Sequence, residues 1–354
     1  MSTVDESFSG TKDVADALAF DEAALASWMA QHVDGYAGPL TVSQFKGGQS
    51  NPTYKLETPS RSYVLRRKPP GKLLPSAHAV DREFRVMKAL GEAGFPCPVM
   101  FGLCMDRDVI GTEFYVMEFV EGRIFWDPLL PGMEPAERAA LYDACNATLA
   151  HLHSIDIEAA GLSDYGKPGD YFQRQIGRWS KQYRAAETET IEAMDRLIEW
   201  LPTAAPEQDR TSVVHGDYRL DNMVFHPTEP RVIAVLDWEL STLGDPMADF
   251  TYQLMGWMVP PSIRNGFLGV DLAPLGIPDV EAYTRAYCER TGRKDIPDLD
   301  FYFAYNLFRL ASICQGIHAR ALQGNASNSM ALETAKAVKP LAEGAWGFAK
   351  KAGA

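Results

Sequence analysis

Residues 213–240 combine a polar loop with two apolar runs, and few folds accommodate that order. The loop is His215-Gly216-Asp217-Tyr218-Arg219-Leu220-Asp221-Asn222. The apolar runs Met223 to His226 and Val232 to Asp237 come next, and the prolines and polar residues between them favour a turn. We therefore predict a β-hairpin that follows the polar loop and whose second, buried strand ends at Asp237.

Asp217, Asn222 and Asp237 are suited to phosphoryl transfer. The spacing His-x-Asp-x-x-x-x-Asn with a later aspartate is that of a kinase catalytic loop. Such a reaction needs a carboxylate that deprotonates the attacking hydroxyl, and hard oxygen ligands that hold Mg²⁺ against the nucleotide phosphates. We predict that Asp217 is the catalytic base and that Asn222 and Asp237 are metal ligands. Taken singly, each residue could instead cap a turn, because Asp and Asn favour loops.

The chain is predicted to have an α+β fold with three parts. Residues 1–34 form an N-terminal extension, residues 35–121 an antiparallel-sheet lobe with one main helix, and residues 122–354 a mostly helical lobe. The expected strands of the first lobe are residues 40–45, 53–57, 62–67, 99–105 and 113–120, and its helix is 77–90. The expected helices of the second lobe are residues 135–153, 171–201, 280–290 and 299–322.

Val64 and Arg66 are predicted to face a nucleotide. Alternate residues of a strand point to the same side, so Val64 can cover the adenine while Arg66 reaches the α- and β-phosphates. The neighbouring Arg67 and Lys68 are predicted to be solvated, because adjacent side chains cannot both point into one cleft.

Glu83 is the expected partner of Arg66. It shares a helical stripe with Val80 and Met87, where an unpaired carboxylate would be costly to bury. An ion pair with Arg66 removes that cost and would position the phosphates as in kinases. The alternative is a glutamate at the edge of the stripe, in contact with water.

Two backbone segments complete the predicted nucleotide site. The turn at residues 47–51 contains Gly48, Ser50 and Asn51, whose N–H groups could lie over the phosphates. Glu118 and Val120, near the end of the strand 113–120, could meet the adenine edge. A plain hairpin turn and a plain strand exit explain these two segments equally well.

Composition excludes several classes of protein. The net charge of −13 argues against nucleic-acid binding, although residues 41–80 carry seven Lys or Arg and one acid, which favours a local anion site. The five cysteines are an odd number without a Cys-x-x-Cys pair, as expected for reduced thiols. No signal-peptide pattern and no apolar run of membrane-spanning length is present. We expect a cytoplasmic protein without a membrane partner.

The chain resembles the aminoglycoside phosphotransferase and choline kinase-like superfamily, and within it the kinase-like domains fused to acyl-CoA dehydrogenases. The resemblance implies a protein-kinase-like two-lobed fold, ATP and Mg²⁺ as cofactors, and a hydroxylated small molecule as acceptor. Lys is usual in the superfamily where this chain has Arg66. The matching segments are Tyr63 to Pro70, Arg82 to Arg85, Phe114 to Glu118, His215 to Asn222 and Leu236 to Phe250.

Two questions stay open at the level of sequence. A non-catalytic nucleotide-binding pseudokinase is the alternative to an enzyme, although the intact set of Asp217, Asn222 and Asp237 argues against it. The acceptor is also open, because an acidic helical lobe suits a cationic aminoglycoside or choline, whereas the resemblance implies a hydroxylated acyl thioester. Candidate walls of the acceptor site are Tyr218, Trp257, Tyr305 and Arg309. The oligomeric state is not predicted.

Overall fold

The computed structural model describes residues 10–46, 51–69, 78–263, 265–322 and 334–354. Its contacts divide the chain into two compact units. The first contains residues 1–127, 156–165 and 219–241, and the second contains residues 128–155, 166–218 and 242–354. The predicted hairpin therefore clusters with the β-rich unit, although we assigned it to the helical lobe from the sequence.

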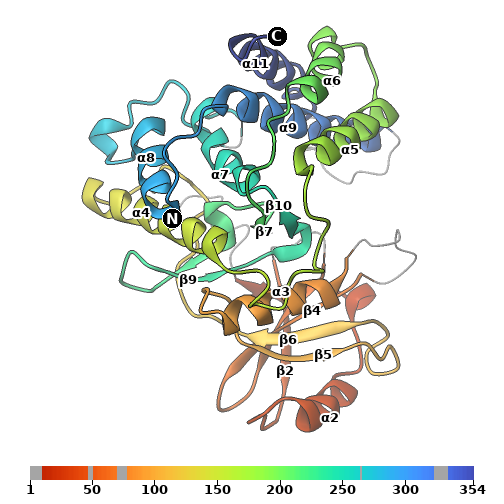
Figure 1. Cartoon of the computed structure of the whole chain (residues 1–354). Coiled ribbons are helices and arrows are strands. Elements are labelled where there is room, and N and C mark those ends of the chain that lie inside the picture. The colour runs from red at the N-terminus through yellow and green to blue at the C-terminus, as the bar shows by residue number, and fades with distance from the viewer. Residues whose placement is uncertain (1–9, 47–50, 70–77, 264, 323–333) are drawn as a thin grey trace. The chain divides into compact units, whose positions relative to one another are not determined.

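An antiparallel sheet forms the centre of the first unit (Figure 1). Its strand order is β1-β2-β3-β4-β6-β5. The five strands expected from the sequence are present, and Thr11–Lys12 adds a short edge strand by pairing with Phe45 and Gln44. The strands are β1 (Thr11–Lys12), β2 (Thr41–Phe45), β3 (Thr53–Glu57), β4 (Ser62–Arg67), β5 (Met100–Cys104) and β6 (Phe114–Glu118).

The two faces of this sheet are covered by different helices. Tyr63 and Leu65 of β4 belong to an apolar cluster with α2 (Glu22–His32), which supplies Leu25 and Met29. The alternate residues of β4 point to the other face, where α3 (Val80–Glu92) lies over β5 and β6 (Figure 1). The period of two therefore directs residues 64 and 66 to one common face, as predicted, and this face lies opposite the apolar cluster that contains Tyr63 and Leu65.

The prediction that Arg67 is solvated is wrong. Its side chain is buried, and it donates through Nη2 to the Leu18 carbonyl at 2.6 Å and through Nε to the Tyr54 hydroxyl at 3.1 Å. Its guanidinium also lies over the Phe20 ring. Residues 16–20 cover this end of the sheet, so both faces of β4 are buried and the N-terminal extension is part of the first unit. The neighbouring Lys68 is partly exposed, with Nζ 3.7 Å from Glu113.

The hairpin of the first unit consists of β8 (Met223–Phe225) and β9 (Val232–Val235), with the short 3-10 helices η2 (Leu220–Asn222) and η3 (Trp238–Leu240) at one end. The segment after β6 lies directly against it. Arg123 exchanges two backbone hydrogen bonds with Phe225, and a Cβ at Gly122 would lie 2.3 Å from the Phe225 carbonyl oxygen. Only glycine fits at Gly122 without a shift of the backbone.

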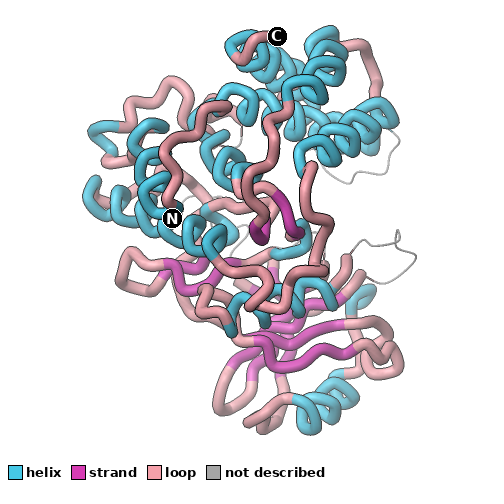
Figure 2. Tube along the Cα trace, in the orientation of Figure 1, coloured by secondary structure: helices cyan, strands magenta, loops and turns pink. Residues whose placement is uncertain are grey.

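Helices dominate the second unit (Figure 2). The helix α9 is central, because it packs against α11, α5 and α7 and is buried over most of its length. Two short strands, β7 (Ser212–Val214) and β10 (Thr242–Gly244), pair with each other. In sequence, β7 comes directly before the polar loop and β10 comes after the hairpin. In the second unit, the described helices of eight or more residues are α4 (Pro135–Ser154), α5 (Tyr171–Ala186), α6 (Glu192–Ala204), α7 (Met247–Leu254), α8 (Val280–Thr291), α9 (Leu299–Leu322) and α11 (Val338–Lys351). The described 3-10 helices of this unit are η4 (Met255–Met258) and η5 (Ala273–Leu275).

The single helix expected at residues 171–201 is two helices, α5 and α6. The break is stabilised from α9, where the Gln315 amide donates to the Ala186 carbonyl at 2.7 Å and to the Thr188 hydroxyl at 2.9 Å. A carbonyl at a helix end needs such a partner when it is buried. The partner comes from a residue more than a hundred positions away, which local periodicity does not reveal.

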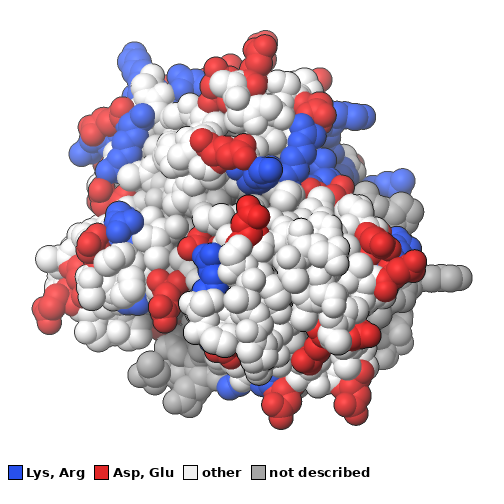
Figure 3. Space-filling model, turned by 90° about the horizontal axis from the view of Figure 1, so that it is seen from below, with Lys and Arg blue, Asp and Glu red and all other residues white. Residues whose placement is uncertain are grey.

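Surface charge agrees with the acidic composition. On the face drawn in Figure 3, acidic and basic side chains of the described residues are interspersed, and the coloured surface has no broad basic area. No described helix has an apolar stretch that could span a membrane.

Candidate functional site

The predicted ion pair between Arg66 and Glu83 is confirmed. Arg66 Nε lies 3.0 Å from Glu83 Oε2, and both side chains are buried. The carboxylate also accepts hydrogen bonds from Asn51 Nδ2 at 2.9 Å and from the Tyr115 hydroxyl at 3.0 Å. Tyr115 is the cross-strand partner of Arg66, so the β4–β6 register places it beside the pair. Glu83 therefore joins α3 to its neighbours in the first unit through two hydrogen bonds and one ion pair.

Arg66 also reaches the hairpin of the first unit. Its Nη2 lies 2.7 Å from Asp237 Oδ1 and 3.3 Å from Glu239 Oε2. One guanidinium thus contacts the carboxylates of Glu83, Asp237 and Glu239. Burial raises the pKa of Glu83 to about 7, and the Arg66 charge opposes this rise. The excess of carboxylates over cations in this cluster favours a bound cation.

The hairpin brings Asn222 and Asp237 to the same end. Met223 pairs with Val235, and the Leu236 N–H donates to the Asn222 carbonyl at 2.8 Å. Residue 222, which precedes β8, and residue 237, which comes after β9, therefore lie at the same end of the hairpin. Asp237 has φ 65° and ψ 61°, a left-handed conformation that is uncommon outside glycine. Such backbone conformations cluster at functional sites, where the surrounding structure holds them.

Asp217 lies in the second unit and contacts α7. Its Oδ1 accepts a hydrogen bond of 2.6 Å from the Tyr252 hydroxyl. Its backbone N–H points to His215 Nδ1 at 3.2 Å. His215 therefore accepts a hydrogen bond within the loop, and its ring is buried.

The backbone of this loop is held from two helices. Asp249 of α7 is fully buried and accepts the N–H groups of His215 at 2.5 Å and of Gly216 at 2.8 Å. Arg309 of α9, also buried, donates to the Gly216 carbonyl at 2.7 Å. Asp249 therefore caps this loop.

Tyr252 was missed from the sequence. It follows Asp249 by three residues, so the two side chains share one face of α7. That spacing was the available signal, since Asp249 belongs to one of the segments that carry the family resemblance. Tyrosine is also common in helical cores, and Tyr252 was not distinguishable from packing residues.

The other predicted nucleotide contacts are only partly described. Gly48 and Ser50 lie outside the described residues. Asn51 is buried, and its side chain bonds Glu83 and, through Oδ1, His78 Nδ1 at 2.8 Å. It therefore joins the residues that follow the glycine turn to the ion pair.

Val64, Glu118 and Val120 lie on or just after paired strands. Val64 is buried opposite Met117. Glu118 exchanges contacts with Val99, donating its N–H to the Val99 carbonyl and accepting the Val99 N–H through Oε2. Its amide is thus used within the sheet, while Val120 lies two residues beyond β6 and is partly exposed.

Three of the candidate wall residues are core residues of the second unit. The Tyr218 hydroxyl donates to the Cys145 carbonyl, and Trp257 Nε1 donates to the Pro278 carbonyl. These two side chains and Tyr305 are buried. The polar atoms of Tyr218 and Trp257 hydrogen-bond within the helical unit itself, which does not favour a role of these two residues in acceptor recognition.

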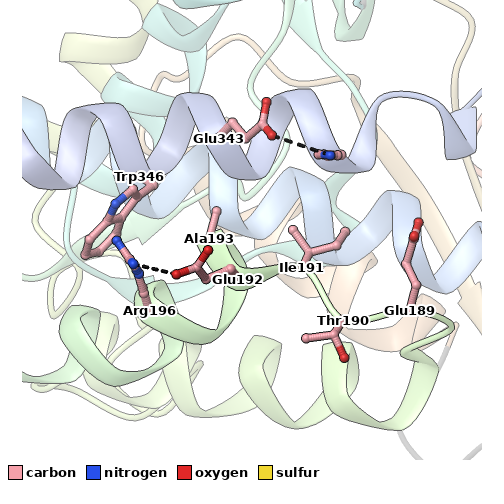
Figure 4. Close-up of a pocket in the computed structure, with 9 residues that line it drawn as sticks. Glu189, Thr190, Ile191, Glu192, Ala193, Arg196, Glu343 and Trp346 are labelled. Carbon is pink, nitrogen blue, oxygen red and sulfur yellow. Dashed lines mark hydrogen bonds and ion pairs between the residues drawn. The ribbon is translucent and has the colours of Figure 1, made fainter.

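A cavity of about 410 Å³ lies between α6 and α11 in the second unit (Figure 4). Each of the two helices carries an exposed ion pair within itself, Arg196 with Glu192 on α6 and Lys339 with Glu343 on α11. The Arg196 guanidinium lies over the Trp346 ring of the other helix. None of the predicted site residues is among its lining residues, which are Glu189, Thr190, Ile191, Glu192, Ala193, Arg196, Lys339, Glu343 and Trp346.

Residues 41–302 match the model of the phosphotransferase enzyme family, APH. The chain belongs to this family. The matched range includes Arg66, Glu83, Asp217, Asn222 and Asp237, so each predicted catalytic or metal-binding residue lies within the APH region.

Relatives of this APH protein include longer acyl-CoA dehydrogenase family members. The chain is 49% identical over 346 residues to mouse (Mus musculus) acyl-CoA dehydrogenase family member 10 and 46% identical over 343 residues to rat (Rattus norvegicus) acyl-CoA dehydrogenase family member 11. These alignments cover 97% and 94% of the chain, but 32% and 44% of the relatives. The chain thus spans less than half the length of these curated relatives.

Solved structures agree with the predicted kinase-like fold of APH proteins. A candidate aminoglycoside phosphotransferase from Ralstonia eutropha JMP134 is 55% identical, with a TM-score of 0.87 over 94% of this chain and 99% of that one. The aminoglycoside phosphotransferase APH(4)-Ia, in a ternary complex with AMP-PNP and hygromycin B, has a TM-score of 0.59 at 14% identity, over 92% of this chain and 99% of that one. The second likeness concerns the fold alone.

Proposed function

We propose that this APH protein transfers the γ-phosphoryl group of ATP, with Mg²⁺, to a hydroxyl of a small molecule by direct in-line displacement. The observation that carries the proposal is the buried Arg66, which pairs with Glu83 on α3 and contacts Asp237 at the end of the hairpin. In kinases, an ion pair between strand and helix positions the phosphates, and an aspartate beyond the catalytic loop holds the metal.

The donor atoms of the first unit fit a magnesium ion. Asn222 and Asp237 offer an amide oxygen and a carboxylate, and Mg²⁺ in phosphoryl-transfer sites takes one or two such ligands together with water and substrate phosphates. No group of three or more His, Cys, Asp or Glu with the arrangement of a metal site occurs among the described residues. A bound Mg²⁺ would offset the charge that develops on the phosphates.

Asp217 is proposed as the base. The acceptor oxygen forms a bond to the γ-phosphorus, the bond from that phosphorus to the β–γ bridging oxygen breaks, and ADP leaves with the electron pair. The proton of the acceptor hydroxyl moves to an Asp217 carboxylate oxygen. In this proposal residues 35–121 hold the nucleotide and residues 122–354 hold the acceptor, while Asn222 and Asp237 would hold the ion.

A hydroxylated acyl thioester is the proposed acceptor class. The names of the relatives favour this class, because these proteins are called acyl-CoA dehydrogenase family members and an acyl-CoA is an acyl thioester. An aminoglycoside is the alternative, which the names of the structural neighbours favour. Both classes present a free hydroxyl, so the same chemistry applies to each.

Incubation of the protein with Mg·ATP and pooled acceptors of both classes tests the proposal. ADP should be released, and one acceptor should gain the mass of one phosphoryl group. Asp217→Ala should lower turnover by about 10²- to 10⁴-fold while ATP binding is kept. Asp221→Ala is the matched control, since this aspartate of the same loop pairs with Arg219. Equal turnover in the two variants would show that Asp217 is not the base, and ATP binding without any turnover would favour the pseudokinase alternative.

A further inference from the structure

The hydrogen bond between Tyr252 and Asp217 is short and sheltered. The donor–acceptor distance is 2.6 Å, and the Tyr252 side chain is only 6% exposed. A hydroxyl that donates to a carboxylate makes a charge-assisted bond, which is about twice as strong as a neutral one and fixes the acceptor more tightly. The contact therefore holds the Asp217 carboxylate in one orientation.

Tyr252 itself is held in place by the same network that anchors the loop. Its ring stacks under the Arg309 guanidinium, 4.9 Å from the ring centroid, and Arg309 donates to the Gly216 carbonyl. Asp249, one helical turn earlier on α7, binds two backbone N–H groups of the loop. The helix thus fixes the loop backbone through residue 249 and the Asp217 side chain through residue 252.

We propose that Tyr252 is a positioning residue for phosphoryl transfer, an inference that rests on the function proposed above. Its hydroxyl donates to Asp217 Oδ1 and thereby fixes the orientation of the carboxylate that receives the acceptor proton. A carboxylate that is free to rotate would present its oxygens in the correct direction for only part of the time, and the rate depends steeply on that geometry. In this role Tyr252 acts on the reaction through Asp217.

The hydrolysis of Mg·ATP, with water as the acceptor, isolates this effect without a known substrate. Water forms the bond to the γ-phosphorus, Asp217 receives its proton and ADP leaves. Tyr252→Phe should lower kcat for ADP release by about tenfold, which corresponds to one lost hydrogen bond, and should leave KM for ATP within about twofold. Tyr302→Phe is the matched control, because Tyr302 is also 6% exposed and packs against Phe172 of the same unit.

A second measurement separates positioning from a folding defect. In an Asp217→Ala background, Tyr252→Phe should have no further effect on kcat, since its hydroxyl has no carboxylate left to orient. Radiolabelled ATP makes the residual rate measurable. A folding defect would lower kcat in both backgrounds.

Three results would overturn the inference. The first is a kcat for Tyr252→Phe equal to that of Tyr302→Phe, and the second is an equal loss in the presence and absence of Asp217. Both would leave the proposed function standing, provided that the unsubstituted protein releases ADP. The third is the absence of ADP release and of phosphoryl transfer by the unsubstituted protein, which would overturn the proposed function as well.

Discussion

Removal of the Glu83 carboxylate should strongly destabilise the first unit. Glu83→Ala leaves two buried donors, Asn51 Nδ2 and the Tyr115 hydroxyl, without their acceptor, and it removes the ion-pair partner of Arg66 Nε. Each such donor costs roughly 1–3 kcal/mol when it has neither partner nor water. Because Arg66 keeps Asp237 and the neighbours relax in part, we expect a loss of roughly 3–6 kcal/mol in the free energy of unfolding.

Urea unfolding followed by circular dichroism measures this loss at pH 7. Glu57→Ala is the matched control, because Glu57 also forms an ion pair in the first unit, with Lys55 at 2.7 Å, but its side chain is 46% exposed. Surface pairs contribute little, so this variant should stay within about 1 kcal/mol of the unsubstituted protein. If Glu83→Ala were as stable as Glu57→Ala, Glu83 would not be the buried acceptor that joins α3 to the sheet.

Two further predictions concern the same two networks. Asp249→Asn places an amide where two loop N–H groups need an acceptor, so it should lower the free energy of unfolding by about 1–3 kcal/mol and slow ADP release; unchanged urea unfolding would contradict this. The second prediction concerns pH: the folded pKa of Glu83, about 7, lies above its ordinary value of 4.5 because the carboxyl is buried, so the folded state binds the proton more tightly. The stabilisation that comes from this tighter proton binding is fully present below pH 4.5 and is lost as the pH rises through 7. The free energy of unfolding should therefore fall by roughly 3 kcal/mol over this range, compared with that of Glu83→Gln, which does not titrate. Urea unfolding of both proteins at several pH values measures the difference, and parallel curves would show that Glu83 does not titrate in this range.

Local patterns predicted the elements that carry the candidate site. The alternation in β4 placed Val64 and Arg66 on one face, and the cost of burying a lone carboxylate on α3 correctly implied a cation beside Glu83. The hairpin followed from two apolar runs around a proline-bearing turn. These features depend on hydrophobic periodicity within one segment and on charge balance between two segments, and both are visible in the sequence.

Features that depend on contacts between distant segments were not predictable in this way. Arg67 is buried because residues 16–20 pack on the sheet, and the break between α5 and α6 is satisfied by Gln315. The sequence of residues 16–20 does not indicate that they contact Arg67, and the sequence around Gln315 does not indicate that it contacts the end of α5. The same holds for Tyr252 and Arg309, whose relation to the loop at residues 215–217 arises only when α7 and α9 pack around it.

An arginine suits position 66 because this side chain contacts three carboxylates. Its Nε faces Glu83 on α3, while its Nη2 faces Asp237 and Glu239 at the end of the hairpin. A lysine has one nitrogen at the end of a flexible stem, whereas a guanidinium presents separate donors in a rigid plane and can contact both sides at once. Arg66 therefore joins the helix, the sheet and the hairpin of the first unit. Because Asp237 is also the proposed metal ligand, its carboxylate must divide its oxygens between Arg66 and Mg²⁺, so the residue that departs from the usual lysine also influences how Asp237 is presented to the ion.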